Sequence, residues 1–177
     1  KTRQFYELLT ERAGQAPGVE RAALTQNPPL GLDNSGDVAF VPEGFQMPRD
    51  RERFRAPMDT VDEGFFPTMG IGIVSGRGFR ATDTAEAPRV AVVNERFAKH
   101  YWPNADAVGK RFRLENAAGT PVEIIGVAQT IKYRDSFDRG IDFVYLPLRQ
   151  HPVARMVLLL KSSDDPVQLL QPVKSIV

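Results

Sequence analysis

The stretch VDEGFFPTMGIGIVSGRGF, residues 61–79, predicts a short helix followed by a short strand. Thr60 and Glu63 have the spacing of a capping box, in which a hydroxyl and a carboxylate satisfy free backbone N–H groups where a helix begins. The apolar face of this helix, one or two turns long, would consist of Phe65, Phe66 and Met69. We therefore expect a short helix that packs through its aromatic side chains.

The glycines of the same stretch predict where the helix ends and where the strand turns. Gly70 stands at the position where many helices end in the left-handed conformation. Ile71 and Ile73 then alternate with Gly72, as apolar and small residues do along a strand. The sequence 76–78, Gly-Arg-Gly, predicts another turn.

The composition is that of a globular protein and excludes several classes of site. The 177 residues suffice for one domain or two small ones, and 42% are hydrophobic. A net charge of +1 gives no electrostatic reason to expect nucleic acid as a partner. Because there is no cysteine, disulfides and thiolate zinc sites are excluded. The longest apolar runs fall far short of the ~20 residues that span a bilayer, so we expect a soluble piece, cut from a longer chain.

On the N-terminal side of the opening stretch, the sequence predicts one helix and two strands. The helix covers about 2–13, and its apolar residues at helical spacing are Phe5, Leu8, Leu9 and Ala13. Strands are predicted at 19–25 and 38–41. The segment 27–37 between them is rich in proline, glycine and asparagine, which predicts a loop.

On the C-terminal side, Asn94 should cap a helix that follows a buried strand at 89–93. The inner face of that helix would carry Phe97 and Tyr101, while Glu95 and Lys99 form an exposed pair. A hairpin is predicted from 110–114 and 122–128.

Three further elements complete the chain. Strands are predicted at 143–148 and 156–161, and the second is so apolar that we expect it in a covered position of a sheet. Asp165 should cap a last helix, whose apolar side would consist of Leu169, Leu170, Val173 and Ile176.

Four arginines alternate with other residues between the second strand and the opening stretch: Arg49, Arg51, Arg53 and Arg55. On a strand this spacing would place all four on one face. One interpretation is a solvated edge whose like charges resist aggregation. The other is a patch for an acidic partner or for lipid head groups, although the acidic residues between the arginines dilute its charge.

No combination of residues predicts catalysis or cofactor binding. The last interval of Gly70, Gly72 and Gly76 is one residue too long for a dinucleotide-binding loop, and these glycines follow a helix instead of a strand. The sequence has no phosphate-binding loop, so we expect no nucleotide binding by this chain. Ser75 has no base nearby in the sequence and is not in a nucleophile elbow.

The titratable residues that could form a site have plainer explanations. His100 and His151 are too far apart in the sequence to suggest a metal site, and His100 is expected at the surface beside Tyr101. The pairs Asp62-Glu63 and Asp164-Asp165 fit the preference for negative charge where helices begin. Trp102 is expected in the core or at the end of a helix. We therefore predict no catalytic, metal or cofactor-binding residue, and no enzyme activity in this chain.

The opening stretch, with PRVAVVNERFAKHYWPNADAVGKRFRL (88–114) and VEIIGVAQTIKY (122–133), resembles the periplasmic core domain of MacB-type ABC transporter permeases. The resemblance extends over nearly the whole chain. It implies an α+β fold made of two subdomains. Residues 1–58 and 139–177 would form a porter-like subdomain, an open-faced sheet with two helices. Residues 59–138 would form an inserted, smaller α/β lobe of the Sabre type.

The resemblance also implies a function and partners. The chain would be the periplasmic domain of a bacterial inner-membrane permease, coupling cytoplasmic ATP hydrolysis to export or to a mechanical signal. The partners would be a second permease subunit, an ATPase domain and, in some relatives, a periplasmic adaptor and an outer-membrane channel. The alternative is a periplasmic binding module that holds a hydrophobic peptide or a lipoprotein, which a broad exposed apolar face on the inserted lobe would favour. If the chain is inserted between membrane helices, the first and last helices should pack antiparallel on the same face of the sheet, with both termini at one end of the domain and the inserted lobe at the far end.

Overall fold

The computed structural model describes residues 2–29, 36–131, 140–163 and 169, and these residues form three helices and nine strands. The helices are α1 (Thr2–Gly14), α2 (Phe65–Met69) and α3 (Glu95–Tyr101). The strands are β1 (Arg21–Thr25), β2 (Asp37–Pro42), β3 (Phe54–Val61), β4 (Ile73–Gly76), β5 (Val90–Asn94), β6 (Arg111–Leu114), β7 (Pro121–Ala128), β8 (Val144–Pro147) and β9 (Val157–Lys161). The fold therefore combines a few helices with one extended sheet. This confirms the mixed helix and strand content of the predicted α+β fold.

Six of the strands pair in a closed ring. The order of pairing is β2-β6-β7-β5-β8-β3, and β2 also pairs with β3, so that both ends of this series meet. Closure gives each of these six strands two partners within the ring. The strand β4 pairs with β7 outside the ring, and β1 and β9 continue from β3. A closed ring was not predicted from the sequence.

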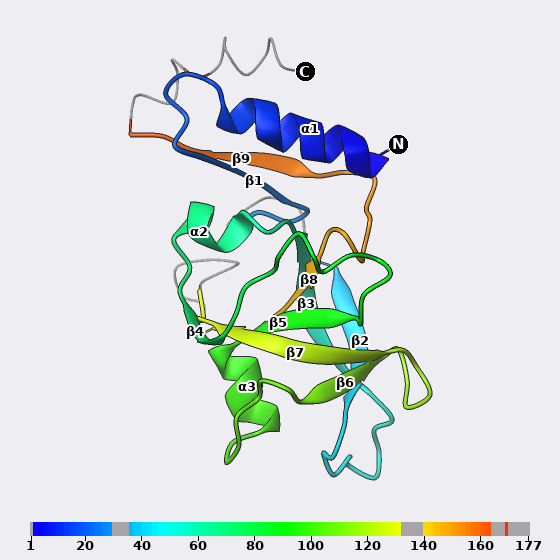
Figure 1. Ribbon diagram of the computed structural model, residues 1–177. Coiled ribbons are helices and arrows are strands. Elements are labelled where there is room, and N and C mark those ends of the chain that lie inside the picture. Colours follow the sequence, from blue (N-terminus) through cyan, green and yellow to red (C-terminus); the bar gives the residue numbers. More distant parts are fainter. Residues whose placement is uncertain (1, 30–35, 132–139, 164–168, 170–177) are drawn as a thin grey trace.

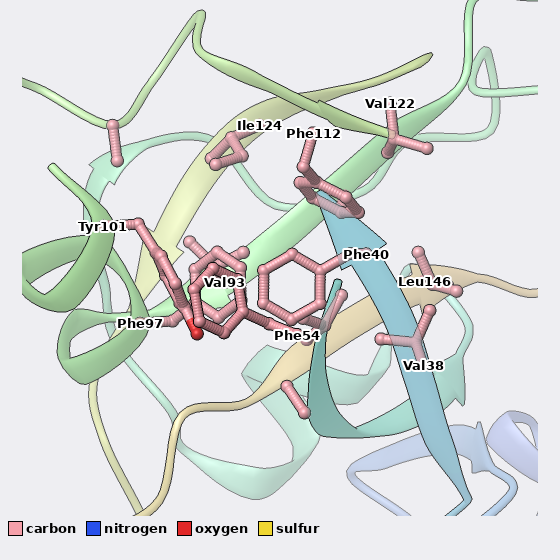
Figure 2. Close-up of a cluster of buried hydrophobic side chains, with 14 of the residues drawn as sticks. Val38, Phe40, Phe54, Val93, Phe97, Tyr101, Phe112, Val122, Ile124 and Leu146 are labelled. Atoms are coloured by element: carbon pink, nitrogen blue, oxygen red, sulfur yellow. The ribbon is translucent and has the colours of Figure 1, made fainter. Parts of the chain in front are cut away.

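The interior of the ring is filled by aromatic and branched side chains, with α3 covering one end of it (Figure 2). Phe40 of β2 is fully buried, and its ring centroid lies 5.0 Å from that of Phe97 in α3 and 5.7 Å from that of Phe112 in β6. Tilted and edge-to-face contacts of this kind add to the free energy gained by burial. Phe40 of β2 thus packs against both α3 and β6.

A second apolar cluster lies on the outside of the ring, beneath α2. Phe65 and Phe66 of α2 are buried, and both rings contact Tyr145 of β8, at centroid distances of 5.8 and 5.0 Å. Leu159 of β9 packs against the same cluster. The aromatic pair therefore anchors the short helix, as the sequence predicts.

The helix α1 and the strands β1 and β9 form a separate layer at the top of Figure 1. The two strands pair antiparallel over five residues, from Arg21 opposite Lys161 to Thr25 opposite Val157. Asp59 of β3 fastens this layer to the ring, because its carboxylate accepts hydrogen bonds from the Thr25 hydroxyl at 2.5 Å and from the backbone N–H groups of residues 26 and 27.

Several local predictions are confirmed. The side chain of Asn94 accepts a hydrogen bond from the Phe97 N–H at 3.0 Å and so caps α3. Phe97 and Tyr101 are buried, and Gly70 ends α2 with a φ of 69°. The strands β6 and β7 form the predicted antiparallel hairpin.

The predicted capping box is wrong. Thr60 is part of β3, which extends to Val61, and α2 begins only at Phe65. The N–H of Gly64 instead donates a hydrogen bond to the carboxylate of Asp62, at 3.0 Å. The helix is therefore shorter than expected, and Met69 at its end is exposed.

The apolar faces of α1 and β9 also differ from the prediction. Of the predicted face of α1, Ala13 is buried and Leu9 packs against the cluster that contains Tyr6, as expected, but Phe5 and Leu8 are exposed and Tyr6 is buried in their place. The strand β9 is half-buried and lies at the end of the described strand order, so its apolar sequence does not mark a covered position.

Two further predictions concern the four alternating arginines and the boundaries of the subdomains. Only Arg55 lies in a strand, so the four arginines do not share a strand face. The predicted boundary between residues 58 and 59 falls within β3, and β2 packs with β6 and α3. The predicted last helix and both chain termini lie outside the described residues, apart from Leu169, which is buried.

Candidate functional site

A groove of about 430 Å³ separates α1 from the turn that precedes α2. Its floor is apolar and comes from β1 and from the residue that follows β8, whereas its two walls are polar. The lining residues are Tyr6, Glu7, Thr10, Glu11, Ala22, Leu24, Asp62, Glu63, Gly64, Leu148 and Arg149. The groove therefore combines residues that are far apart in the sequence, and it is the first candidate for a functional site.

Arg149 connects the two walls of this groove. Its guanidinium donates to the carboxylate of Glu7 on α1 and, at 3.0 Å, to the carboxylate of Glu63 in the turn. The hydrogen bond to Glu63, together with the charge of both glutamates, holds the pKa of Arg149 above its usual value. Only 22% of the Arg149 side chain is exposed, so solvent screens these pairs less than it screens an ordinary surface pair.

Asp62 lies at the end of the same groove and is almost fully buried. Burial raises the pKa of Asp62 to about 7, and the nearby charge of Glu63 acts in the same direction, while backbone hydrogen bonds oppose it. The sequence suggested only favourable charge at the start of a helix for Asp62 and Glu63. Asp62 does accept a hydrogen bond from the Gly64 N–H, just before the helix begins. The sequence did not indicate that Asp62 is buried or that Glu63 pairs with Arg149.

The chemistry that this groove offers is ionic and acid–base in character. It holds a carboxyl group that titrates near neutrality, beside a guanidinium that is already paired with two carboxylates. In the part of the chain that the structure describes, no group of three or more histidine, aspartate or glutamate side chains is arranged to hold a metal ion. The clearest role of these residues is a link between α1 and the turn.

A second polar cluster joins α3 to the residues before β8. His100 Nδ1 lies 2.5 Å from a carboxylate oxygen of Asp142, and Arg96 Nε lies 3.3 Å from the other oxygen. The His100 ring stacks on Tyr101, with centroids 4.4 Å apart, which confirms its predicted place beside that residue. Its carboxylate partner comes from a distant part of the sequence, and no local pattern predicts it.

His151 is not in a site with His100. It lines a different hollow, of about 390 Å³, together with Thr60 and Gln150. The Nε2 of His151 and the hydroxyl of Thr60 are buried without hydrogen-bond partners among the described residues. Burial, with a contribution from Arg89, lowers the pKa of His151 to about 4, so its imidazole is neutral at pH 7. The pair Asp164-Asp165 lies outside the described residues.

The remaining sequence candidates occupy structural positions. Gly76 has a φ of 70°, and a Cβ atom there would lie 2.2 Å from the carbonyl oxygen of residue 125, so the chain needs glycine for close packing. Trp102 follows α3 as its C-cap and packs against the ring interior. Arg51 lies over the ring of Phe54 at 5.5 Å, and Arg53 lies 4.0 Å from Glu115 at the surface.

Comparison with known proteins assigns a family. The model of the family described as "MacB-like periplasmic core domain" matches residues 5–176. A relative, the uncharacterized ABC transporter permease YknZ of Bacillus subtilis (strain 168), is 27% identical over 166 residues. That alignment covers 88% of this chain but 41% of the relative, so the chain spans about two fifths of the relative's length.

Solved structures share the fold. The extracellular domain of the noncanonic ABC-type transporter YknZ from Gram-positive bacteria gives a TM-score of 0.58 at 14% identity, over 96% of this chain and 76% of that one. The periplasmic region of MacB from Actinobacillus actinomycetemcomitans gives 0.62 at 17% identity, over 95% of this chain and 69% of that one. Among the described helices, none has the length and apolar character required to cross a bilayer.

Proposed function

The chain belongs to the family of MacB-like periplasmic core domains, as the periplasmic or extracellular domain of an ABC transporter permease, and on that premise we propose that it transmits motion. In the parent protein, ATP hydrolysis on the cytoplasmic side would change the position of this domain. The domain would thereby drive export or pass a mechanical signal outward. The observation that carries the proposal is the family match, which covers nearly the whole chain.

The arrangement of the layers supports this function. Strands from the two ends of the sequence, β1 and β9, lie side by side in the α1 layer, and the ring projects from that layer (Figure 1). A chain inserted between membrane segments would leave and re-enter the bilayer near this layer. We propose that the α1 layer, with the residues after β9, is the porter-like subdomain, and that the Sabre-like lobe begins at β2 instead of at residue 59.

The proposed partners follow from the same function. They are a second permease subunit or domain, an ATPase domain on the same chain or another, and, in some systems, an adaptor and an outer-membrane channel. We propose that the domain itself carries no catalytic residue and binds no nucleotide. The alternative, a module that holds a hydrophobic peptide or lipoprotein, has less support, because Met69 and Val74 are the exposed large apolar side chains of the described lobe.

The test is a distance measurement in the intact parent permease. The chain contains no cysteine, so Ala117→Cys in the exposed β6–β7 turn and, separately, Gln15→Cys after α1 can each carry a spin label in this domain. We expect the distance between the two subunits' labels at residue 117 to change when ATP is added, with a smaller change at residue 15. A permease whose ATPase is inactivated serves as the control. Unchanged distances at both positions during ATP hydrolysis would refute the transmission of motion.

A further inference from the structure

The helix α1 contacts the sheet with only part of its apolar surface. It turns Tyr6, Leu9 and Ala13 toward the sheet, where Leu9 packs against the cluster formed with Leu24 and Leu148, whereas Phe5 and Leu8 remain 52% and 51% exposed. Because stabilisation by burial grows with the apolar area removed from water, a helix that leaves two of its large apolar side chains exposed gains only part of the stabilisation that it could gain. The position of α1 therefore depends on its other contacts.

Arg149 provides such a contact across the groove. It follows β8, a fully buried strand of the ring, and so extends from a well-packed part of the molecule. Its planar guanidinium can hold two carboxylates at once, and here it holds Glu7 of α1 and Glu63 of the turn. The bridge thus ties α1 to the turn before α2.

The charges around the groove oppose a closed position once this cation is removed. The groove-lining residues include Glu7 and Glu11 from α1, Asp62 and Glu63 from the turn, and Arg149 from the segment after β8. Four carboxyl groups thus face one guanidinium. Like charges at short range repel, so loss of the guanidinium would leave the helix facing acidic residues across an open space of about 430 Å³.

We propose that α1 is a hinged element, held against the turn before α2 by the bridge of Arg149 to Glu7 and Glu63, and that the groove widens when this bridge breaks. The two states differ in the distance between the helix and the turn, while the ring keeps its packing. This device is a property of the chain itself, and its test does not require a transporter.

The test is amide hydrogen exchange, followed by NMR on the 177-residue chain at fixed pH and low salt. A helix of 13 residues that leaves the sheet is marginal in water, so release of α1 exposes its amides to exchange. In Arg149→Ala, the backbone amides of α1 should therefore exchange about fivefold faster, as for a loss of about one kcal/mol in local opening. The amides of α3 serve as the internal reference and should keep their rates. Equal acceleration of α1 and α3 would mean global destabilisation and would overturn the proposal.

Conservative variants keep the proposal testable even if Arg149→Ala folds poorly. Glu7→Gln and Glu63→Gln each keep the side-chain shape and remove one charge of the bridge, so each should accelerate exchange in α1. The matched control is Arg111→Ala, which breaks an exposed pair with Glu123 at 3.5 Å on the hairpin. If neither glutamine variant accelerates exchange in α1 beyond the rate in that control, the bridge does not hold the helix.

Discussion

Arg77 and Asp83 are joined by two parallel hydrogen bonds, each 2.8 Å long, which fasten the loop after β4. Burial alone would raise the pKa of Asp83, but the bonds from Arg77 and from the Arg80 N–H outweigh it and hold that pKa below its usual value. The Asp83 side chain is 7% exposed, so its carboxylate depends on this partner for its charge.

We predict that Arg77→Ala destabilises the chain by about 2–3 kcal/mol, because it leaves a buried carboxylate without its cation. This range lies below the ~3–5 kcal/mol lost when a fully buried pair is broken, because 31% of the Arg77 side chain is exposed. Urea denaturation monitored by circular dichroism measures the change. Arg111→Ala, at an exposed pair, should cost less than about 1 kcal/mol. Equal losses in both variants would show that burial of Asp83 does not matter.

The second prediction concerns Asp62 and pH. The pKa of Asp62 is about 7 in the folded chain and near its ordinary value of 3.8 in the unfolded chain, so between these pH values the folded state binds more protons. The stability contributed by protonated Asp62 is therefore fully present below about pH 4 and is lost as pH rises through 7. In Asp62→Asn this dependence should disappear. The free energy of unfolding of both proteins, measured by urea titration from pH 4 to 8, tests it; parallel curves would contradict the prediction.

The third prediction separates the buried from the exposed part of α2. Phe65→Ala and Phe66→Ala should each cost about 3–5 kcal/mol, because a buried aromatic side chain leaves a cavity. Met69→Ala, on the same helix but at an exposed position, should cost less than about 1 kcal/mol. Thermal unfolding distinguishes these results. A similar melting temperature for all three variants would mean that α2 is not anchored by its aromatic pair.

The fourth prediction concerns the exposed arginines. Replacing Arg51 and Arg53 together by serine should change the free energy of unfolding by less than roughly 1 kcal/mol, as at other surface positions. In the intact permease the same change should leave transport nearly unaltered. A loss of transport by a normally folded double variant would identify these arginines as a surface for an acidic partner, the interpretation that we do not favour.

Local structure was largely predictable because its determinants are neighbours in the sequence. Asn94 caps α3 through a residue three positions later, and Gly70 ends α2 by its own backbone conformation. The wrong prediction of a capping box at Thr60 also relied on neighbouring residues alone. The spacing of a capping box was present, but β3 continues through Thr60, and pairing in the sheet prevailed over capping.

The groove could not be predicted, because its residues meet only through the fold. Arg149 contacts Glu7 across 142 positions and Glu63 across 86. The closed ring could not be predicted for the same reason, since the sequence of β2 predicts a strand but does not identify the two strands with which it pairs. The face of α1 was predicted only in part, because helical spacing alone does not distinguish Leu8, which is exposed, from Tyr6, which is buried.

The pairing of β1 with β9 imposes an order on folding. These strands lie near opposite ends of the sequence, with Arg21 opposite Lys161, and contacts between such distant residues form late because a long loop must first be closed. Once the ring has formed, the intervening chain is compact and the two strands are brought within reach of each other. The ring should therefore fold first and the α1 layer last. During synthesis, β1 must wait for its partner until the rest of the described chain has been made, with its apolar residues exposed in the meantime.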